Sequence, residues 1–414
     1  MTIIVQKYGG SSLATTERIK DVAKRVVRAK EEGNSVIVVV SALGDTTDGL
    51  IKKAYEITPD PPEREMDMLL ATGEQMSTAL LAMAVQALGH EAISFTGLQV
   101  GIVTDMVHTK AKIVDVKSQR ILEEIEKGKI VIVAGFQGVT VDQDITTLGR
   151  GGSDLTAVAL AAKLKAAVCE IYTDVDGVYT TDPRLVPEAR KIPVISYDEM
   201  LEMAATGAKV MQSRSVEYGK NYGVVIHVRS SLTGEPGTLI KETGQMMEKA
   251  IISGITYDVA EAKITILGVP DRPGIAAMVF KSLADGNINV DMILQNVSER
   301  GTTDISFTVN KEDLKRAESV VEGIVKELGA KGSTYDEGIA KVSVVGAGMR
   351  THPGVAANMF GALAEKNINI EMISTSAIKI SCVIREEHVK EAVQALHKKF
   401  DLGKEKVREV VGED

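Results

Sequence analysis

The chain has 414 residues, of which 44% are apolar and 25% charged, and its 48 basic and 57 acidic residues give a formal net charge of −9. The apolar fraction excludes wholesale disorder, and the acidic balance disfavours nucleic acid as a partner, because nucleic-acid binding needs clustered Lys and Arg. No apolar run approaches the roughly 18 residues of a membrane span, so we expect a cytoplasmic protein without a membrane partner.

The first 230 residues alternate β-branched runs with helical periods. Strands are predicted at 3–6, 35–40, 130–134 and 168–173, and helices at 16–32, 66–88 and 154–164. The run 35–40 is apolar on both faces, which is typical of a central parallel strand covered by helices on each side. The alternation predicts an α/β sandwich on a largely parallel sheet, with ligands bound by the loops that follow the strands.

The last third of the chain contains an internal repeat. Residues 273–293 align without gaps to 353–373, an offset of 80 residues, and 12 of the 21 positions are identical. Each copy predicts a strand, a Pro-Gly loop, a helix and a second strand, and further strands and helices complete two βαββαβ units. These flanking elements are strands at 305–309 and 378–384 and helices at 312–328 and 386–399.

A glycine-containing loop, Lys7-Tyr8-Gly9-Gly10-Ser11-Ser12, follows the first strand and precedes the first helix. Paired glycines let backbone amides approach an anion closely, and Lys7 adds a positive charge. A plain tight turn explains the same residues equally well. The chain has no G-x-x-x-x-G-K-[ST], which excludes a P-loop NTPase, and no G-x-G-x-x-G that would support a dinucleotide fold.

A second glycine cluster, 149–154, opens the predicted helix that begins at Asp154. Ser153 or Asp154 could simply cap this helix. Capping does not explain an arginine among three glycines, which is costly in backbone entropy. Arg150 beside exposed amides is suited to hold a carboxylate or a phosphate.

Three further groups of residues could take part in chemistry. The loop 174–184 contains three acids with Tyr179 and Arg184, and it is either a solvated turn or a set of nucleotide and magnesium ligands. The loop 41–47 offers hydroxyls at the same predicted edge of the sheet. Glu74 lies beside Gly73 in a long apolar helix, where Gly73 suggests a break.

The six histidines and two cysteines show no metal-ligand spacing, so no protein-held metal site is predicted. Cys169 and Cys382 are interpreted as small buried hydrophobes. No Ser-His-Asp or Cys-His signature is present.

Taken together and in order, these motifs resemble the aspartate kinase family, in its monofunctional form with two C-terminal ACT domains. The resemblance rests on KYGGSS, SALGDTTD, TGEQ, GFQGVT, TLGRGGSD and TDVDGVYTTDPR, followed by two PG…NIN repeats, and it covers essentially the whole chain. Tyr8 and Ser11 stand where many relatives have Phe and Thr. Both changes keep an aromatic ring and a hydroxyl.

The resemblance implies an α/β fold: an amino acid kinase (carbamate kinase-like) three-layer αβα sandwich plus two ferredoxin-like βαββαβ ACT domains. The implied boundaries are 1–235 for the catalytic domain, 236–262 for a linker and the first strand of the regulatory region, 263–338 for the first ACT domain and 339–414 for the second.

The implied activity is transfer of the γ-phosphoryl of ATP, with Mg²⁺, to the side-chain carboxylate of L-aspartate, the first step toward lysine, threonine and methionine. The implied catalytic residues are Lys7, Glu74 and Asp154. The implied nucleotide-binding residues are Lys7, Gly9, Gly10, Thr173, Asp174, Tyr179, Arg184 and Lys209. The implied aspartate-binding residues are Ser41, Thr47, Glu74, Arg150, Gly151, Gly152 and Ser153.

The resemblance also implies feedback inhibition by lysine, threonine or both, a homo-oligomer paired through the ACT domains, and in some relatives a separate regulatory subunit. The candidate effector contacts are Asp271, Gly274, Ile275, Ala276, Gln295, Asn369 and Ile370. Two alternatives are weighed against this reading. One is an amino acid kinase acting on glutamate or an acylated glutamate, which the tandem repeats and GRGGSD disfavour. The other is a catalytically silent amino-acid sensor, which would be expected to lack Lys7, Arg150 or Asp174.

Overall fold

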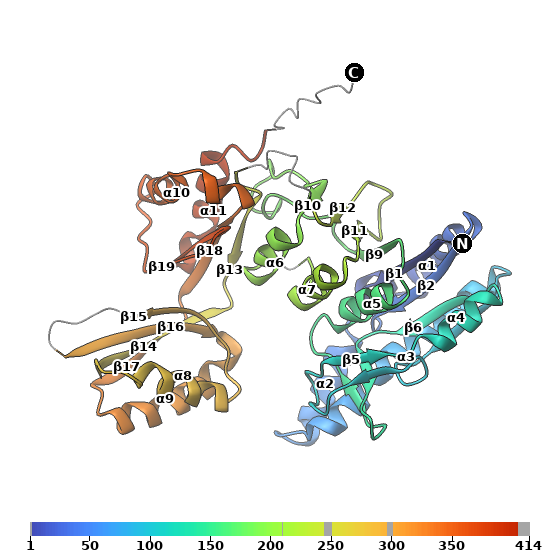
Figure 1. Cartoon of the computed structure of the whole chain (residues 1–414), viewed down its shortest axis with the longest axis horizontal. Helices are drawn as coiled ribbons and strands as arrows, with labels where there is room; N and C mark the ends of the chain where they lie inside the picture. Colours follow the sequence, from blue (N-terminus) through green and yellow to red (C-terminus); the bar gives the residue numbers. More distant parts are fainter. Residues whose placement is uncertain (1, 209, 244–250, 296–300, 405–414) are drawn as a thin grey trace. The chain divides into compact units, whose positions relative to one another are not determined.

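A computed structural model describes residues 2–208, 210–243, 251–295 and 301–404. The chain divides into two compact units (Figure 1). The first comprises Met1–Tyr179, Lys191–Ala205 and Lys209–Met247, and the second comprises Thr180–Arg190, Thr206–Ala208 and Glu248–Asp414.

The first unit is built on an eight-stranded sheet with the strand order β10-β12-β11-β9-β1-β2-β6-β3. Every neighbouring pair is parallel except β11 and β12, which confirms the predicted, largely parallel sheet. The strands are β1 (Thr2–Tyr8), β2 (Asn34–Val40), β3 (Ala92–Phe95), β6 (Ile130–Ala134), β9 (Val168–Thr173), β10 (Val194–Ile195), β11 (Ile226–Ser230) and β12 (Thr238–Ile240).

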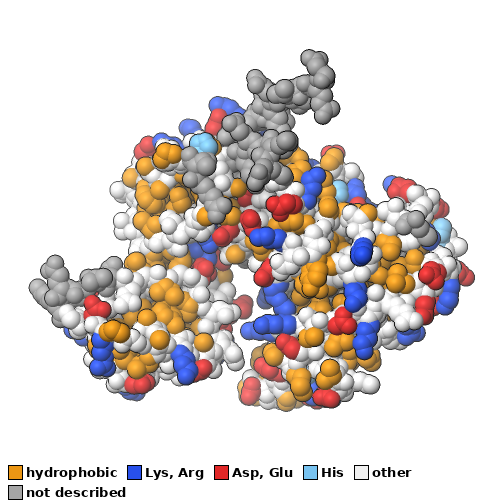
Figure 2. Space-filling model, viewed as in Figure 1, with side chains coloured by type: hydrophobic (Ala, Val, Ile, Leu, Met, Phe, Trp, Pro, Cys, Tyr) orange, Lys and Arg blue, Asp and Glu red, His pale blue; other side chains and the backbone are white. Residues whose placement is uncertain are grey.

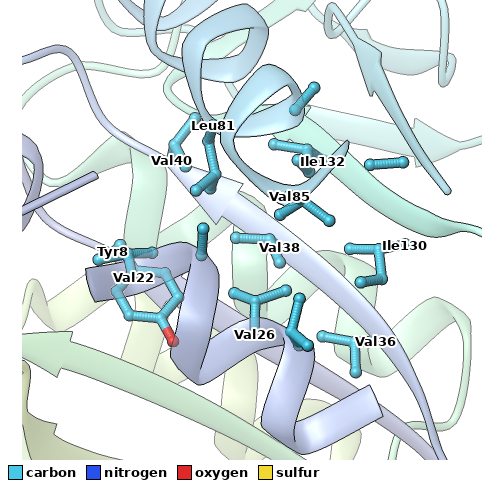
Figure 3. Packing of buried hydrophobic residues seen from close by; sticks show 14 of the residues in the cluster. Tyr8, Val22, Val26, Val36, Val38, Val40, Leu81, Val85, Ile130 and Ile132 are labelled. Atoms are coloured by element: carbon cyan, nitrogen blue, oxygen red, sulfur yellow. The ribbon is translucent and has the colours of Figure 1, made fainter. Parts of the chain in front are cut away.

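Helices cover both faces of this sheet, as the doubly apolar β2 predicts. Val36, Val38 and Val40 of β2 face α1 and α3, where they pack with side chains such as Val26 and Leu81 (Figure 3). The other face of β1, β2 and β9 contacts α5. The helices of this unit are α1 (Thr16–Glu31), α2 (Thr46–Ile57), α3 (Glu63–Ala87), α4 (Gln119–Glu126), α5 (Gly152–Lys163), α6 (Tyr197–Ala205) and α7 (Ser213–Tyr222), with a 3₁₀ turn η1 (Gly10–Leu13).

Helix α3 is the one described helix that is long and apolar enough, by length and composition, to cross a membrane. Half of its most apolar window is buried inside the structure. A long core helix packed on a sheet has the same length and composition, and α3 packs on α1 and β3 in this way.

The first unit also contains a small sheet that the sequence patterns did not predict. Its strand order is β5-β4-β7-β8. The strands are β4 (Ile102–Thr104), β5 (Ile113–Val116), β7 (Gln137–Val139) and β8 (Ile145–Thr147). Strands of three or four residues are too short to show a reliable alternation, which explains why they were missed.

The second unit contains two four-stranded sheets, each flanked by two helices, which confirms the predicted pair of related folds; the first of them follows the predicted order βαββαβ along the chain. The first sheet has the order β15-β16-β14-β17 and the second β13-β18-β20-β19. The strands are β13 (Gly254–Asp258), β14 (Glu261–Pro270), β15 (Val290–Gln295), β16 (Thr302–Asn310), β17 (Gly332–Asp336), β18 (Ile339–Val345), β19 (Met372–Thr375) and β20 (Lys379–Arg385). The helices are α8 (Ile275–Asp285), α9 (Leu314–Leu328), α10 (Val355–Ala364) and α11 (Val389–Lys399), with 3₁₀ turns η2 (Lys311–Asp313), η3 (Ala347–Thr351) and η4 (Glu386–His388).

The second fold is not continuous in the sequence, because its fourth strand comes from before the first fold rather than after α11. Strand β13 precedes all strands of the first sheet but pairs with β18 in the second, because Ile252 and Ile255 belong to the hydrophobic core around β18 and α11. Strand β12 lies in the large sheet of the first unit. The predicted linear division at 235/236, 262/263 and 338/339 therefore separates β12 and β13 from the sheets that they complete.

A segment from the middle of the chain also packs in the second unit. Val186 of Thr180–Arg190 is 4% exposed and belongs to the same core as β13, β18 and α11. The Ile255 amide donates to the Thr180 carbonyl at 2.7 Å, and Thr180 Oγ1 lies 3.1 Å from His397 Nε2 on α11. This segment directly follows the loop at the end of β9, so the loop is joined covalently to the second unit.

Candidate active site

The candidate residues converge because neighbouring parallel strands end at one edge of the large sheet. Lys7 of β1 lies beside Val39 of β2, and Tyr8 of β1 lies beside Tyr172 of β9. At the next pair, Val40 of β2 lies beside Ala134 of β6. The loops that follow β1, β2, β6 and β9 therefore leave the sheet together, as the parallel arrangement predicts.

Lys7 and Asp154 form an ion pair at this edge. Lys7 Nζ lies 2.7 Å from Asp154 Oδ1, and the two side chains are only 12% and 10% exposed. Asp154 lies in the first turn of α5, where the helix dipole favours a carboxylate. A Cβ on Gly9 would lie 3.4 Å from Lys7 Nζ, so the ammonium group rests against the glycine loop.

Glu74 presents an unpartnered carboxylate oxygen inside the first unit. Its Oε1 accepts a hydrogen bond from the Ala42 amide at 3.0 Å, whereas the buried Oε2 has no hydrogen-bond partner among the described residues. Burial raises the pKa of Glu74 to about 7, and the bond from Ala42 opposes this shift. A carboxylate oxygen left without a donor is suited to accept one from a bound ammonium group.

Gly73 brings Glu74 to this position without breaking the helix. A Cβ at Gly73 would lie 2.8 Å from the Ala42 Cβ, so the absence of a side chain lets α3 approach the loop after β2. The predicted break at Gly73 is wrong, because α3 runs without interruption from Glu63 to Ala87.

The raised pKa of Glu74 makes the stability of the protein depend on pH. Between about pH 4.5 and about pH 7 the folded state holds a proton that the unfolded state has released, so the free energy of unfolding falls as pH rises through this window. The loss is at most about 3.5 kcal/mol, at about 1.4 kcal/mol per pKa unit. We expect this part of the pH dependence to be absent from Glu74→Gln, whose side chain cannot ionise. Urea unfolding at about pH 5 and about pH 8 gives the change in the free energy of unfolding with pH for wild type and variant. If that change is identical in the two proteins, the assignment to Glu74 is contradicted.

Arg150 lies in a tight turn that leads into α5. The Gly152 amide donates to the Gly149 carbonyl at 2.9 Å, and Gly149 and Gly151 have φ angles of +79° and +71°, which favour glycine. The exposed Arg150 has no hydrogen-bond or ion-pair partner in the described part of the chain. Its guanidinium group is therefore available to a ligand.

The structure excludes the alternative that Ser153 or Asp154 caps helix α5. The N-cap of α5 is Gly151, and no side chain makes a capping hydrogen bond there. Ser153 and Asp154 lie inside the first turn and are 6% and 7% exposed. A Cβ on Gly135, after β6, would lie 2.7 Å from Ser153 Oγ, so this serine lies against the end of the large sheet.

The loop after β2 adds hydroxyl groups and explains Gly10. The Ser41 amide donates to the Tyr8 carbonyl at 3.1 Å, and Ser41 and Thr47 are both half-buried. A Cβ on Gly10 would lie 2.8 Å from the Ala42 carbonyl oxygen. Gly10 is therefore required for the close packing of the loops after β1 and β2.

Apart from Lys7, Gly9 and Gly10, the predicted nucleotide-binding residues divide into three groups. Thr173, Asp174 and Tyr179 lie in the first unit at and after the end of β9, where Thr173 Oγ1 donates to Asp174 Oδ1 at 3.0 Å and burial raises the pKa of Tyr179. Arg184 belongs to the second unit and pairs with Asp182 at 2.8 Å. Lys209 lies outside the described residues.

Sequence patterns missed a buried polar network behind the Arg150 turn. Asp67 on α3 is fully buried and bonds to His108, Thr109 and Thr147. An aspartate at an apolar position of a long helix was the signal that could have revealed it. The two cysteines are free and buried, as predicted, and burial raises the pKa of both thiols.

Comparison with protein-family models defines the class. Residues 2–230 match the amino acid kinase family, and residues 264–323 and 342–400 match the ACT domain. The fold and the site thus define this protein as an amino acid kinase with two ACT domains. The large sheet and the helices that cover it form the amino acid kinase domain.

Comparison with individual proteins identifies the family within this class. The aspartokinase of Mycolicibacterium smegmatis is 54% identical over 97% of this chain and 97% of its own. E. coli aspartokinase III in complex with aspartate and ADP is 25% identical, with a TM-score of 0.81 over 96% of this chain and 99% of that chain. The same enzyme in complex with lysine and aspartate is 26% identical, with a TM-score of 0.74 over 96% of this chain and 99% of that chain. The chain belongs to the aspartokinase family, whose members are ATP-dependent phosphotransferases.

Proposed function

We propose that this protein transfers the γ-phosphoryl group of MgATP to the β-carboxylate of L-aspartate, giving 4-phospho-L-aspartate and ADP. The observation that carries the proposal is the buried Oε2 of Glu74, which has no hydrogen-bond partner within the described ranges, at the sheet edge where Lys7 lies. This oxygen is suited to the substrate ammonium group, and the free guanidinium of Arg150 is suited to its α-carboxylate. Ser41, Thr47, Gly151, Gly152 and Ser153 would complete the aspartate site.

The proposed chemistry needs positioning and charge neutralisation rather than a general base. An ionised β-carboxylate is itself the nucleophile that attacks the γ-phosphorus, and the bond to the β-phosphate oxygen breaks as ADP leaves. Lys7 would neutralise negative charge on the transferred group, and Asp154 would hold the Lys7 ammonium in place through the ion pair at 2.7 Å. Gly9 and Gly10 would lie beneath the phosphates.

The nucleotide would be held by Thr173, Asp174, Tyr179, Arg184 and Lys209. No group of three or more His, Cys, Asp or Glu side chains in the described ranges could hold a metal ion. Mg²⁺ commonly binds through substrate phosphates and only one or two carboxylates, so the ion would arrive with ATP. The exposed carboxylate of Asp174 at the end of β9 fits as a protein ligand.

The second unit is proposed to bind an amino-acid inhibitor, lysine or threonine, as expected of an enzyme at the start of the pathway to these amino acids. Gly274 and Gly354 begin α8 and α10 with φ angles of +95° and +97°, so both repeats present exposed helix N-termini in the same way. The lysine complex of E. coli aspartokinase III supports an effector of this kind. The proposed contacts are Asp271, Gly274, Ile275, Ala276, Gln295, Asn369 and Ile370.

The segment Thr180–Arg190 offers a physical connection between effector and nucleotide. It carries Arg184, continues the loop that carries Asp174 and Tyr179, and packs through Val186 into the core of the second ACT domain. An effector that binds one arrangement of the ACT domains better than another would therefore act on a segment joined directly to the nucleotide loop.

The ACT domains are also proposed to pair two copies of the chain. Strands β15 and β19 are edge strands of their sheets, and both carry exposed apolar side chains, Ile293, Leu294 and Ile373. Figure 2 shows apolar side chains gathered in groups among charges of both signs. Exposed apolar edges of this kind favour strand pairing with another copy.

An ATP-dependent hydroxamate assay tests the proposed substrate. Purified protein with MgATP and hydroxylamine is supplied in parallel with L-aspartate, L-glutamate or N-acetyl-L-glutamate, and each reaction is repeated with lysine, threonine or both. We expect hydroxamate with aspartate at a rate at least about 100-fold above that with either glutamate compound, because a site built around one chain length loses its polar contacts with another. Equal or faster reaction with a glutamate compound would contradict the proposal.

A further inference from the structure

We propose that Asp67 is a positioning residue for aspartate binding, because it fixes the turn that carries Arg150; this inference rests on the role proposed for Arg150. Asp67 belongs to the same helix as Glu74 but lies two turns earlier, and it is 0% exposed. None of the sequence motifs includes it, and it has no role in the phosphoryl transfer itself.

The Asp67 carboxylate joins two segments that are distant in the sequence. Its Oδ1 accepts from Thr147 Oγ1 at 2.5 Å, and its two oxygens lie 3.1 and 3.0 Å from the Thr109 amide nitrogen. Its Oδ2 lies 2.7 Å from His108 Nδ1. One buried carboxylate thus holds both the end of β8 and the loop between β4 and β5.

Both segments border the Arg150 turn. Thr147 is the last residue of β8, and its carbonyl accepts from the Ala111 amide at 2.9 Å. A Cβ on Gly149 would lie 3.3 Å from the Thr109 carbonyl oxygen, so the held loop forms one wall of the turn. Arg214 on α7 closes the arrangement by donating to the carbonyls of Leu148 and Ala111 at 2.8 and 3.0 Å.

The wall is held in a strained conformation. Thr109 is β-branched but has a φ of +63°, in the left-handed region that such residues rarely occupy. A conformation of this kind costs about 1–3 kcal/mol and persists only where its surroundings enforce it. The hydrogen bonds from the Thr109 amide to Asp67 supply that enforcement. If one of the two carboxylate oxygens of Asp67 is replaced, the loop that contains Thr109 is free to relax away from Gly149.

A purely structural role for Asp67 predicts a different result from a positioning role. Loss of general stability reduces the fraction of folded enzyme, and so lowers the measured kcat while leaving both KM values unchanged. Displacement of Arg150 instead weakens binding of the substrate whose carboxylate Arg150 holds. A displacement of about 1 Å can cost about 100-fold in an enzyme site, so the effect on aspartate is expected to be large and selective.

The experiment compares Asp67→Asn with two substitutions of its partner, Thr147→Val and Thr147→Ser. We expect Asp67→Asn and Thr147→Val to raise KM for aspartate about 10- to 100-fold while KM for MgATP changes less than about twofold. Thr147→Ser keeps the hydroxyl and is expected to retain the wild-type KM. If Asp67→Asn does not fold, the Thr147 pair still decides the outcome.

Two further variants complete the test. Glu124→Gln removes another buried carboxylate of the first unit. Glu124 lies on α4 and pairs with Lys127 and Lys129, which follow the helix, and its substitution should leave both KM values unchanged. In Arg150→Ala, adding Asp67→Asn should have little further effect on KM for aspartate, because residues acting through one another are not additive. Wild-type KM for aspartate in folded Asp67→Asn, or an equal rise for both substrates, would overturn the inference. A wild-type enzyme that does not use aspartate at all would instead refute the proposed function.

Discussion

Lys7→Met is expected to lower kcat by about 10³-fold or more, because removing one group that stabilises charge in a phosphoryl-transfer transition state has an effect of this size. The methionine side chain has nearly the length of lysine but no charge. In the structure Lys7 Nζ is the cation at the end of β1, 2.7 Å from Asp154 Oδ1. KM for aspartate should change little, since Lys7 is assigned to the phosphates. Steady-state kinetics with MgATP and aspartate measure both parameters.

The control for Lys7→Met concerns Asp154, the buried ion-pair partner of Lys7. Without Lys7, the Asp154 carboxylate, whose side chain is 10% exposed, loses its ion-pair partner, and the protein is destabilised. Adding Asp154→Asn to Lys7→Met removes that charge, so thermal stability should recover while activity stays low. A folded Lys7→Met enzyme with kcat within about tenfold of wild type would contradict the role of Lys7.

Arg150→Ala is expected to raise KM for aspartate about 100-fold and to leave KM for MgATP within about twofold of wild type. The size follows from the loss of a charge-assisted hydrogen-bonded pair with the substrate α-carboxylate, at about 1.4 kcal/mol per tenfold change. Stability should be unaffected, because Arg150 is exposed and has no partner among the described residues.

A matched control is Arg64→Ala. Arg64 is an arginine of the same unit that pairs with Glu65 and Asp144 at the surface, so its loss should change neither KM. If Arg150→Ala raises both KM values equally, Arg150 does not hold aspartate specifically and the proposed orientation of the substrate is wrong.

Much of the fold was predictable because the local signals were strong. Strand β2 is apolar at successive positions, and such a run is buried on both faces only in a sheet covered by helices. The repeat between 273–293 and 353–373 likewise revealed two folds of one kind. The glycines around Arg150 pointed to a loop whose exposed amides and arginine could hold an anion, and the structure places this loop at the N-terminus of α5 without a capping side chain.

What sequence patterns missed depends on contacts between distant segments. Strand β13 with the residues that flank it and the segment Thr180–Arg190 complete a core whose other members follow residue 338. Neither segment has a local sequence pattern that indicates what it packs against. For this reason the sequence predicts consecutive domains, whereas the compact units of the structure combine segments that are separated in the chain. Asp67 was missed because its partners, His108, Thr109 and Thr147, come together only through tertiary packing.

The central claim is that the acceptor is the β-carboxylate of aspartate, and trapping the product tests it most directly. The enzyme is incubated with MgATP, L-aspartate and hydroxylamine, and the hydroxamate is identified by mass spectrometry and NMR. Because Glu74 and Arg150 are assigned to the ammonium and α-carboxylate groups, the account predicts aspartate β-hydroxamate, formed in step with ADP. Aspartate α-hydroxamate, or ADP formation without any hydroxamate, would contradict it.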